Sequence, residues 1–133
     1  MNLALTPKNK TRKELRYSKE TLNFAENTYT MDSTIFSDIK EIAKKVIPNN
    51  GHVILFGSQA RGDFHKGSDW DLLILIDKPK IEESDHDKYT YPFWELGWKV
   101  DAMIHPVIYT LSDWQNKKSV FRSNVEKDGI RVC

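Results

Sequence analysis

The sequence of 133 residues contains a single cysteine, Cys133 at its end. One cysteine excludes disulfides within the chain and any zinc site built from several cysteines, and it is typical of proteins of a reducing cytoplasm. No apolar run approaches the ~18 residues that cross a bilayer, so we expect no membrane-spanning segment. Residues 1–7 lack a basic and apolar leader, so we expect no signal peptide and a cytoplasmic protein.

The chain also has little net charge, because 20 Lys and Arg residues nearly balance 19 Asp and Glu residues. This balance argues against binding of nucleic acid or membrane through bulk positive charge. Residues 1–30 nevertheless carry a net charge of +3 and few apolar side chains, whereas residues 31–133 carry −2. We therefore interpret residues 1–30 as a basic N-terminal arm that can form one helix. Residues 31–133 are long enough for one domain with one core.

Apolar periodicity predicts alternating helices and strands in this domain. A stripe with steps of three and four residues predicts a helix that begins near Asp32 and ends at residues 48–51. Short apolar runs predict strands over residues 52–56, 70–76 and 98–104. Further helices are expected over residues 59–62, part of 81–96 (where Pro92 should break or kink the helix), 110–118 and 119–128, the last ended by Gly129. Because the run 70–76 is apolar at every position except Asp71, we expect an α+β fold whose sheet has helices on both faces.

Three acids fall on or beside the predicted strands. Asp69 and Asp71 are two residues apart at the start of a strand, so their side chains point to the same side. Two such carboxylates repel each other unless a cation lies between them, and Mg²⁺ or Mn²⁺ suits oxygen ligands. Asp101 lies inside the predicted strand 98–104 and would add a third carboxylate if that strand is a neighbour. Taken alone, two acids at this spacing are more often solvated residues beside a turn than metal ligands, and Asp101 alone could simply pair with a lysine.

A glycine and a serine follow the first predicted strand. Gly57 allows a tight turn and the close approach of a ligand. Ser58 would cap the next helix, where free N–H groups favour an anion such as phosphate, and Arg61 could meet the same phosphate. An ordinary strand-to-helix turn with a surface arginine is the alternative. Together with the acids, a phosphate-binding turn would make a two-metal phosphoryl-transfer site.

Two motifs carry a family resemblance. Gly57-Ser58-Gln59-Ala60-Arg61-Gly62, followed by Gly67-Ser68-Asp69-Trp70-Asp71-Leu72, resembles the signature of the nucleotidyltransferase superfamily that includes DNA polymerase β. The resemblance is strongest to the minimal, stand-alone domains of prokaryotes and covers residues 33–132. Val100-Asp101 matches the third acid of the family less specifically, and residues 124–130 resemble its closing helix and strand.

The resemblance implies a small mixed β-sheet flanked by helices and a reaction at the acids. Asp69 and Asp71 would hold two Mg²⁺ ions (or Mn²⁺), and Asp101 would hold one of them. Gly57, Ser58 and Arg61 would bind the triphosphate of an NTP, with ATP as the expected donor. A nucleoside monophosphate would pass to an acceptor hydroxyl with release of pyrophosphate.

Minimal members of this family often pair with a small helical protein, a toxic ribonuclease that they neutralise by adding AMP to it. The resemblance therefore implies the antitoxin of a two-protein module. An antibiotic-type, small-molecule nucleotidyltransferase is the alternative, although such enzymes normally need a second domain or a dimer for the acceptor. A non-catalytic binding module is a third interpretation, against which the three retained acids argue.

Other partners are less favoured by the sequence. The arm lacks interleaved aromatic residues for stacking bases, so we do not expect a nucleic acid substrate. A homo-oligomer is compatible with the sequence, which leaves the oligomeric state open. The aromatic cluster of Phe93, Trp94 and Trp98 is interpreted as core, with the lining of a nucleotide pocket as the alternative.

Overall fold

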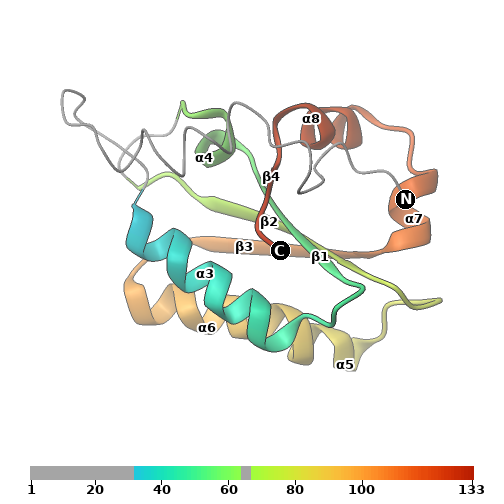
Figure 1. The fold of residues 1–133 in the computed structure, drawn as a ribbon, viewed down its shortest axis with the longest axis horizontal. Helices are drawn as coiled ribbons and strands as arrows, with labels where there is room; N and C mark the ends of the chain where they lie inside the picture. The colour runs from blue at the N-terminus through green and yellow to red at the C-terminus, as the bar shows by residue number, and fades with distance from the viewer. Residues whose placement is uncertain (1–31, 64–66) are drawn as a thin grey trace.

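The computed structural model describes residues 32–63 and 67–133. The helix expected in residues 1–30 lies outside the described residues. The elements follow the expected order of helix, strand, strand, helix, strand and helices (Figure 1). They are α3 (Ser33–Val46), β1 (His52–Phe56), α4 (Ser58–Arg61), β2 (Trp70–Ile76), α5 (Glu83–Asp85), the π-helix η2 (His86–Thr90), α6 (Tyr91–Val100), β3 (Ile104–Thr110), α7 (Leu111–Asn116), α8 (Val120–Asp128) and β4 (Ile130–Arg131).

The strands form one mixed sheet in the order β3-β2-β1-β4. β1 pairs antiparallel with both β2 and β4, and β2 pairs parallel with β3. In Figure 1, α3 and α6 lie on one side of this sheet, and α7 and α8 lie on the other. The expected α+β fold with a small mixed sheet between helices is confirmed.

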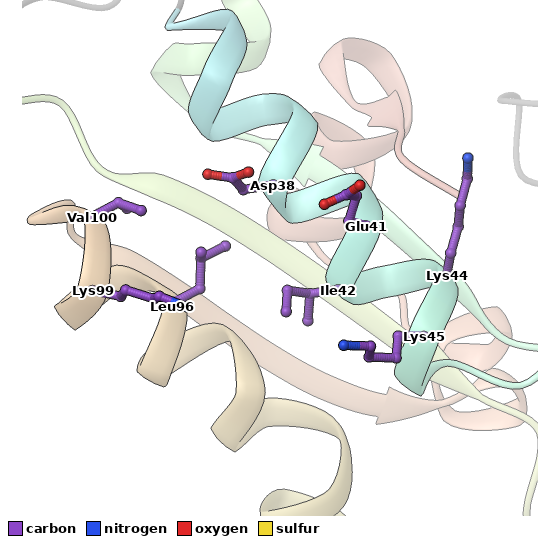
Figure 2. Close-up of a pocket in the computed structure, with 8 residues that line it drawn as sticks. All are labelled: Asp38, Glu41, Ile42, Lys44, Lys45, Leu96, Lys99 and Val100. Carbon is purple, nitrogen blue, oxygen red and sulfur yellow. The ribbon is translucent and has the colours of Figure 1, made fainter.

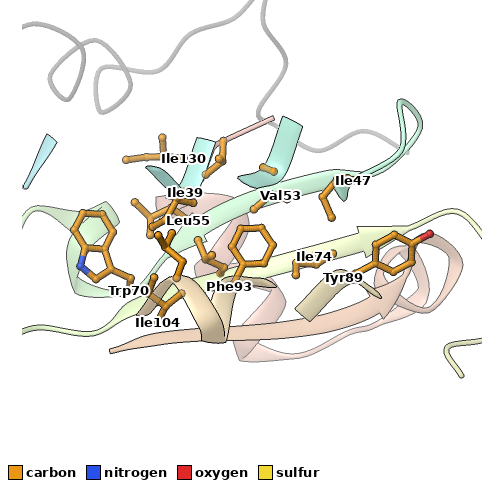
Figure 3. Packing of buried hydrophobic residues seen from close by; sticks show 14 of the residues in the cluster. Ile39, Ile47, Val53, Leu55, Trp70, Ile74, Tyr89, Phe93, Ile104 and Ile130 are labelled. Atoms are coloured by element: carbon orange, nitrogen blue, oxygen red, sulfur yellow. The ribbon is translucent and has the colours of Figure 1, made fainter. Parts of the chain in front are cut away.

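Side chains alternate between the two faces of the sheet, as the period of two along a strand requires. On the face toward α3 and α6, Val53 and Leu55 of β1 pack with Ile39 and Phe93 from the helices (Figure 3). On the opposite face, the buried residues are Ile54, Leu73, Leu75, Trp114 and Val125. The prediction that the apolar strand 70–76 is covered on both faces is therefore confirmed.

The first helix has the predicted start. The carboxylate of Asp32 accepts hydrogen bonds from the backbone N–H groups of Thr34 (2.9 Å) and Ile35 (3.2 Å), so Asp32 is the N-cap. α3 then ends at Val46, before Pro48. Within the described residues, no helix is long and apolar enough to cross a membrane.

The third strand lies elsewhere than predicted. α6 continues through Val100, and Asp101 ends it with a left-handed backbone (φ 54°, ψ 49°). The strand begins only at Ile104, so the expected strand over residues 98–104 is wrong. Its supposed end, His105-Pro106, lies inside β3. Proline is tolerated there because β3 is an edge strand of the sheet and needs no donor on its outer side.

Two further details differ from expectation. Pro92 does not end the helical segment, because it stands in the first turn of α6, directly after the π-helical turn η2. Gly129 does follow α8, but its backbone is extended (φ −64°, ψ 151°) instead of left-handed. Its N–H still donates to the carbonyl of Val125 at 2.7 Å and so closes the helix.

Candidate active site

The antiparallel pairing of β1 and β2 brings the two sequence motifs together. Phe56, the last residue of β1, is in register with Asp71, so the turn at Gly57 lies beside the acids. Gly57 has a φ of +78°, and a Cβ atom at this position would overlap Oδ2 of Asp71. The carboxylate of Asp71 therefore lies against backbone that only glycine leaves accessible.

The two aspartates of the motif differ in environment. Asp71 is half-buried, and the Asp69 side chain is 51% exposed. Burial raises the pKa of Asp71, and the negative charge of Asp69 raises it further, while His105 and Arg61 lower it without cancelling the rise. Burial and the charge of Asp69 thus both disfavour the ionised form of Asp71, and a bound cation would favour it.

The turn after β1 starts a helix of four residues. Gly57 is its N-cap and makes no side-chain capping bond, so the prediction that Ser58 caps this helix is wrong. The first N–H groups that bond back to the turn are those of Ala60 (3.1 Å) and Arg61 (3.0 Å), both to the carbonyl of Gly57. The N–H groups that precede Ala60 have no acceptor within the helix, as at any helix start. Arg61 stands one turn along and pairs with Asp63 at 3.2 Å.

Two residues that the sequence reasoning did not single out also reach this region. Gln59 is 5% exposed, and its Nε2 donates to the carbonyl of Ser68 at 3.2 Å, which ties α4 to the residue before Asp69. His105 on β3 is in register with Asp71, and its Nε2 lies 3.4 Å from Oδ2 of Asp69. The glutamine lies inside the first motif. Nothing in the sequence reasoning pointed to the histidine, because the third strand was expected over residues 98–104 and so ended before it.

Asp101 is not brought onto the strand that neighbours the other two acids. It is the exposed residue at the end of α6, and the charges that shift the pKa of Asp71 come from Asp69, His105 and Arg61. In the part of the chain that the structure describes, no group of three or more His, Cys, Asp or Glu side chains is placed to hold a metal ion. The strand position on which the expected role of Asp101 rested is therefore wrong.

The remaining pair still suits a divalent cation. Asp69 and Asp71 offer carboxylate oxygens, the ligand type that Mg²⁺ prefers, and their mutual repulsion falls when a cation binds. Magnesium is commonly held by one or two carboxylates and completes its coordination with water and substrate phosphates. The residues present therefore fit a cation that arrives together with a nucleotide.

The aromatic cluster divides between core and surface. Phe93 is fully buried, as expected, whereas Trp94 is partly buried and Trp98 is 67% exposed. The interpretation of Trp98 as core is therefore wrong. Trp98 instead makes an edge-to-face contact with Tyr91 on the outside of α6.

A separate groove of about 890 Å³ lies between α3 and α6 (Figure 2). Its floor is apolar, and both acids and lysines stand around it. None of the residues that line it belongs to the site around Asp71, so we do not assign the nucleotide to this groove. The lining residues are Asp38, Glu41, Ile42, Lys44, Lys45, Leu96, Lys99 and Val100.

Comparison with known proteins agrees with this geometry. Residues 36–127 match the model of the family described as nucleotidyltransferase domain. A protein of Methanocaldococcus jannaschii with the provisional name protein adenylyltransferase is 36% identical over 96 residues, which is 71% of this chain and 88% of that protein.

Solved structures share the fold. One described as a toxin-antitoxin with AMP-PNP has a TM-score of 0.54 at 19% identity, and covers 74% of this chain and 72% of that one. Another, of a tri-AMPylated Shewanella oneidensis HEPN toxin in complex with MNT antitoxin, has a TM-score of 0.50 at 16% identity and covers 77% and 72%. With the family match over most of its length, this chain belongs to the nucleotidyltransferase domain family and is a nucleotidyltransferase.

Proposed function

We propose that this protein is a Mg²⁺-dependent protein nucleotidyltransferase that transfers AMP from ATP to a hydroxyl group of a partner protein and releases pyrophosphate. The observation that carries the proposal is the pair Asp69 and Asp71 at the start of β2, with Asp71 packed against the turn at Gly57. This arrangement places a cation site beside a glycine turn that can accept phosphate.

Each side chain of the site has a role in this proposal. Asp69 and Asp71 hold the divalent cation, which supplies charge neutralisation to the phosphates when it is bound. The turn of Gly57 and Ser58 offers backbone N–H groups to the triphosphate, and Arg61 adds positive charge beside it. Gln59 holds the carbonyl of Ser68 and so fixes the approach of the chain to Asp69.

From the sheet order we further infer the side from which the acceptor comes. The phosphate turn follows β1, and β3 lies on the other side of β2. In phosphoryl transfer the attacking oxygen and the leaving group are roughly in line, on opposite sides of the phosphorus. With pyrophosphate leaving over the β1 side, the acceptor hydroxyl approaches from the side of β3.

The comparisons support a protein as the acceptor. The relative from Methanocaldococcus jannaschii bears the name of a protein adenylyltransferase, and the structural neighbours are antitoxins, one of them bound to an AMPylated HEPN toxin. We infer that this chain is likewise the antitoxin of a two-protein module and modifies a small helical partner.

Label transfer tests the proposal directly. The protein is incubated with α-labelled ATP, Mg²⁺ and a lysate of its own host, beside the double variant Asp69→Asn/Asp71→Asn. We expect label on one small protein with the wild type and none above background with the variant. Label on a small molecule alone would instead establish a small-molecule transferase. The absence of transfer from all four labelled triphosphates, with partner binding intact in the double variant, would establish a binding module.

A further inference from the structure

The parallel pairing of β2 and β3 adds a third side chain to the pair of acids. His105 is in register with Asp71, so the two side chains leave neighbouring strands on the same face of the sheet. The imidazole Nε2 lies 3.4 Å from Oδ2 of Asp69. A histidine therefore lies beside the two acids on the neighbouring strand, where the expected strand 98–104 was to place Asp101.

A second contact limits how the imidazole can turn. The ring of Trp94, on α6, meets that of His105 edge to face, with 5.6 Å between centroids and 88° between planes. α6 itself packs on β3, so both rings are carried by elements that contact each other. A side chain already restricted by packing loses little rotamer freedom when it makes a polar contact.

The two acids differ in how their carboxylates are held. Asp71 lies within β2 and packs against Gly57. Asp69 precedes the first residue of β2, and half of its side chain is exposed, so its carboxylate needs another means of orientation. The Nε2 of His105 lies within ion-pair distance of that carboxylate, at 3.4 Å.

We propose that His105 is a positioning residue for Asp69, whose Nε2–H holds one carboxylate oxygen and thereby presents the other to the divalent cation. This inference rests on the proposed function, because it assigns Asp69 to the cation. Carboxylates that bind metals are commonly oriented by such hydrogen bonds, and removal of the orienting group typically weakens metal binding or activity about 10–100-fold.

Calorimetric titration with Mg²⁺ tests the inference apart from catalysis. The full chain is saturated with a non-hydrolysable ATP analogue and titrated with Mg²⁺, and label transfer is measured in parallel. We expect His105→Leu to weaken Mg²⁺ binding about 10-fold. His105→Gln, whose amide Nε2 can donate from nearly the same place, should stay within about 3-fold of the wild type, a difference of about 0.7 kcal/mol. His86→Leu is the matched control, because it makes the same change at an exposed histidine on η2.

The outcomes separate the inference from the proposed function. A wild type that binds no Mg²⁺ and transfers no label overturns the function. A wild type that does both, with Mg²⁺ binding unchanged in His105→Leu, overturns the inference alone. If His105→Leu raises only the KM for the acceptor, His105 contacts the acceptor and the inference is also overturned. Should the leucine variant unfold, Trp94→Leu takes its place, because it removes the ring that packs on His105. Weaker Mg²⁺ binding in Trp94→Leu supports the inference, and unaltered Mg²⁺ affinity in that variant overturns it.

Discussion

Gly57 is the residue at which backbone conformation and packing most clearly exclude a side chain. Its φ of +78° is open to glycine and costly for other residues, and a Cβ would overlap the carboxylate of Asp71. We expect Gly57→Ala to lower the free energy of unfolding by about 1–3 kcal/mol through backbone strain. It should also reduce label transfer more than 10-fold, on the order of the loss for one misplaced catalytic contact. Thermal unfolding and the transfer assay measure the two effects separately.

Gly67 provides the matched control for this prediction. It has a similar φ of +82°, but no atom of the described residues, its own chain neighbours aside, lies within 4 Å of the place where a Cβ would stand. Gly67→Ala should therefore show the loss of stability with most of the transfer retained. Equal loss of transfer in both variants would show that contact with Asp71 is not the reason for glycine at position 57.

At the scale of single residues, local spacing was enough to predict one part of the site and not the other. Asp69, Asp71 and Gly57 could be predicted because the period of a strand and the glycine after it are properties of adjacent residues. His105 could not, since it reaches Asp69 through the register of β3 against β2, which links residues more than 30 positions apart.

At the scale of elements, the end of α6 decides whether Asp101 belongs to the site. Asp101 has a left-handed backbone (φ 54°), which glycine adopts without the cost of about 1 kcal/mol that other residues meet. We expect Asp101→Gly to leave the melting temperature unchanged or raise it by a few degrees. It should also retain transfer and Mg²⁺ dependence, because the structure places this residue outside the paired strands. Loss of transfer in a folded Asp101→Gly protein would return Asp101 to the catalytic set.

The start of α5 contains an ionised aspartate whose effect on stability depends on pH. Asp85 is buried, and its Oδ2 accepts from Lys78 Nζ (2.8 Å) and from the backbone N–H of Glu82 (2.7 Å). The bond from Lys78 lowers the pKa of Asp85 most, and the backbone bond lowers it further. A lowered folded-state pKa means that this stabilisation is complete above the ordinary value of 3.8 and is lost as the pH falls below it.

The variant Asp85→Asn tests this pH dependence. It should unfold at a lower temperature than the wild type at pH 7, and the gap between the two should narrow as the pH falls from 4 to 3. Melting curves across pH 3–7 give the comparison. Parallel curves over the whole range would show that ionisation of Asp85 does not stabilise the start of α5.

The elements that were predicted well are those that form a single periodic run between clear signals. α3 runs from its cap at Asp32 to the turn around Pro48, and the predicted bounds of β1 and β2 match those observed. β3 was misplaced because residues 98–100 continue the helical pattern of α6, and because Pro106 was taken to end a strand. Proline fits there only at a sheet edge, and sheet order is not a local property of the sequence.

At the scale of the whole molecule, the site is a product of topology. The turn after β1, the start of β2 and the start of β3 meet at one end of a sheet whose two faces are packed by separate sets of helices. The family motif spans the first two of these segments and predicted the reaction type. The third segment, the start of β3, joins the site through its pairing with β2. It places His105 beside the acids, whereas Asp101 lies at the end of α6.

The same topology predicts that residues 31–133 fold without residues 1–30. The N-cap of α3 is Asp32, and the buried apolar residues of the described chain run from Ile39 to Val132. We expect the shortened chain to unfold cooperatively within a few degrees of the full chain, as followed by circular dichroism. Asp32→Ala in the full chain, which removes the cap, should by contrast cost about 1 kcal/mol. If the shortened chain loses its cooperative transition, residues 1–30 contribute to the core, and the proposed domain boundary at residue 31 is wrong.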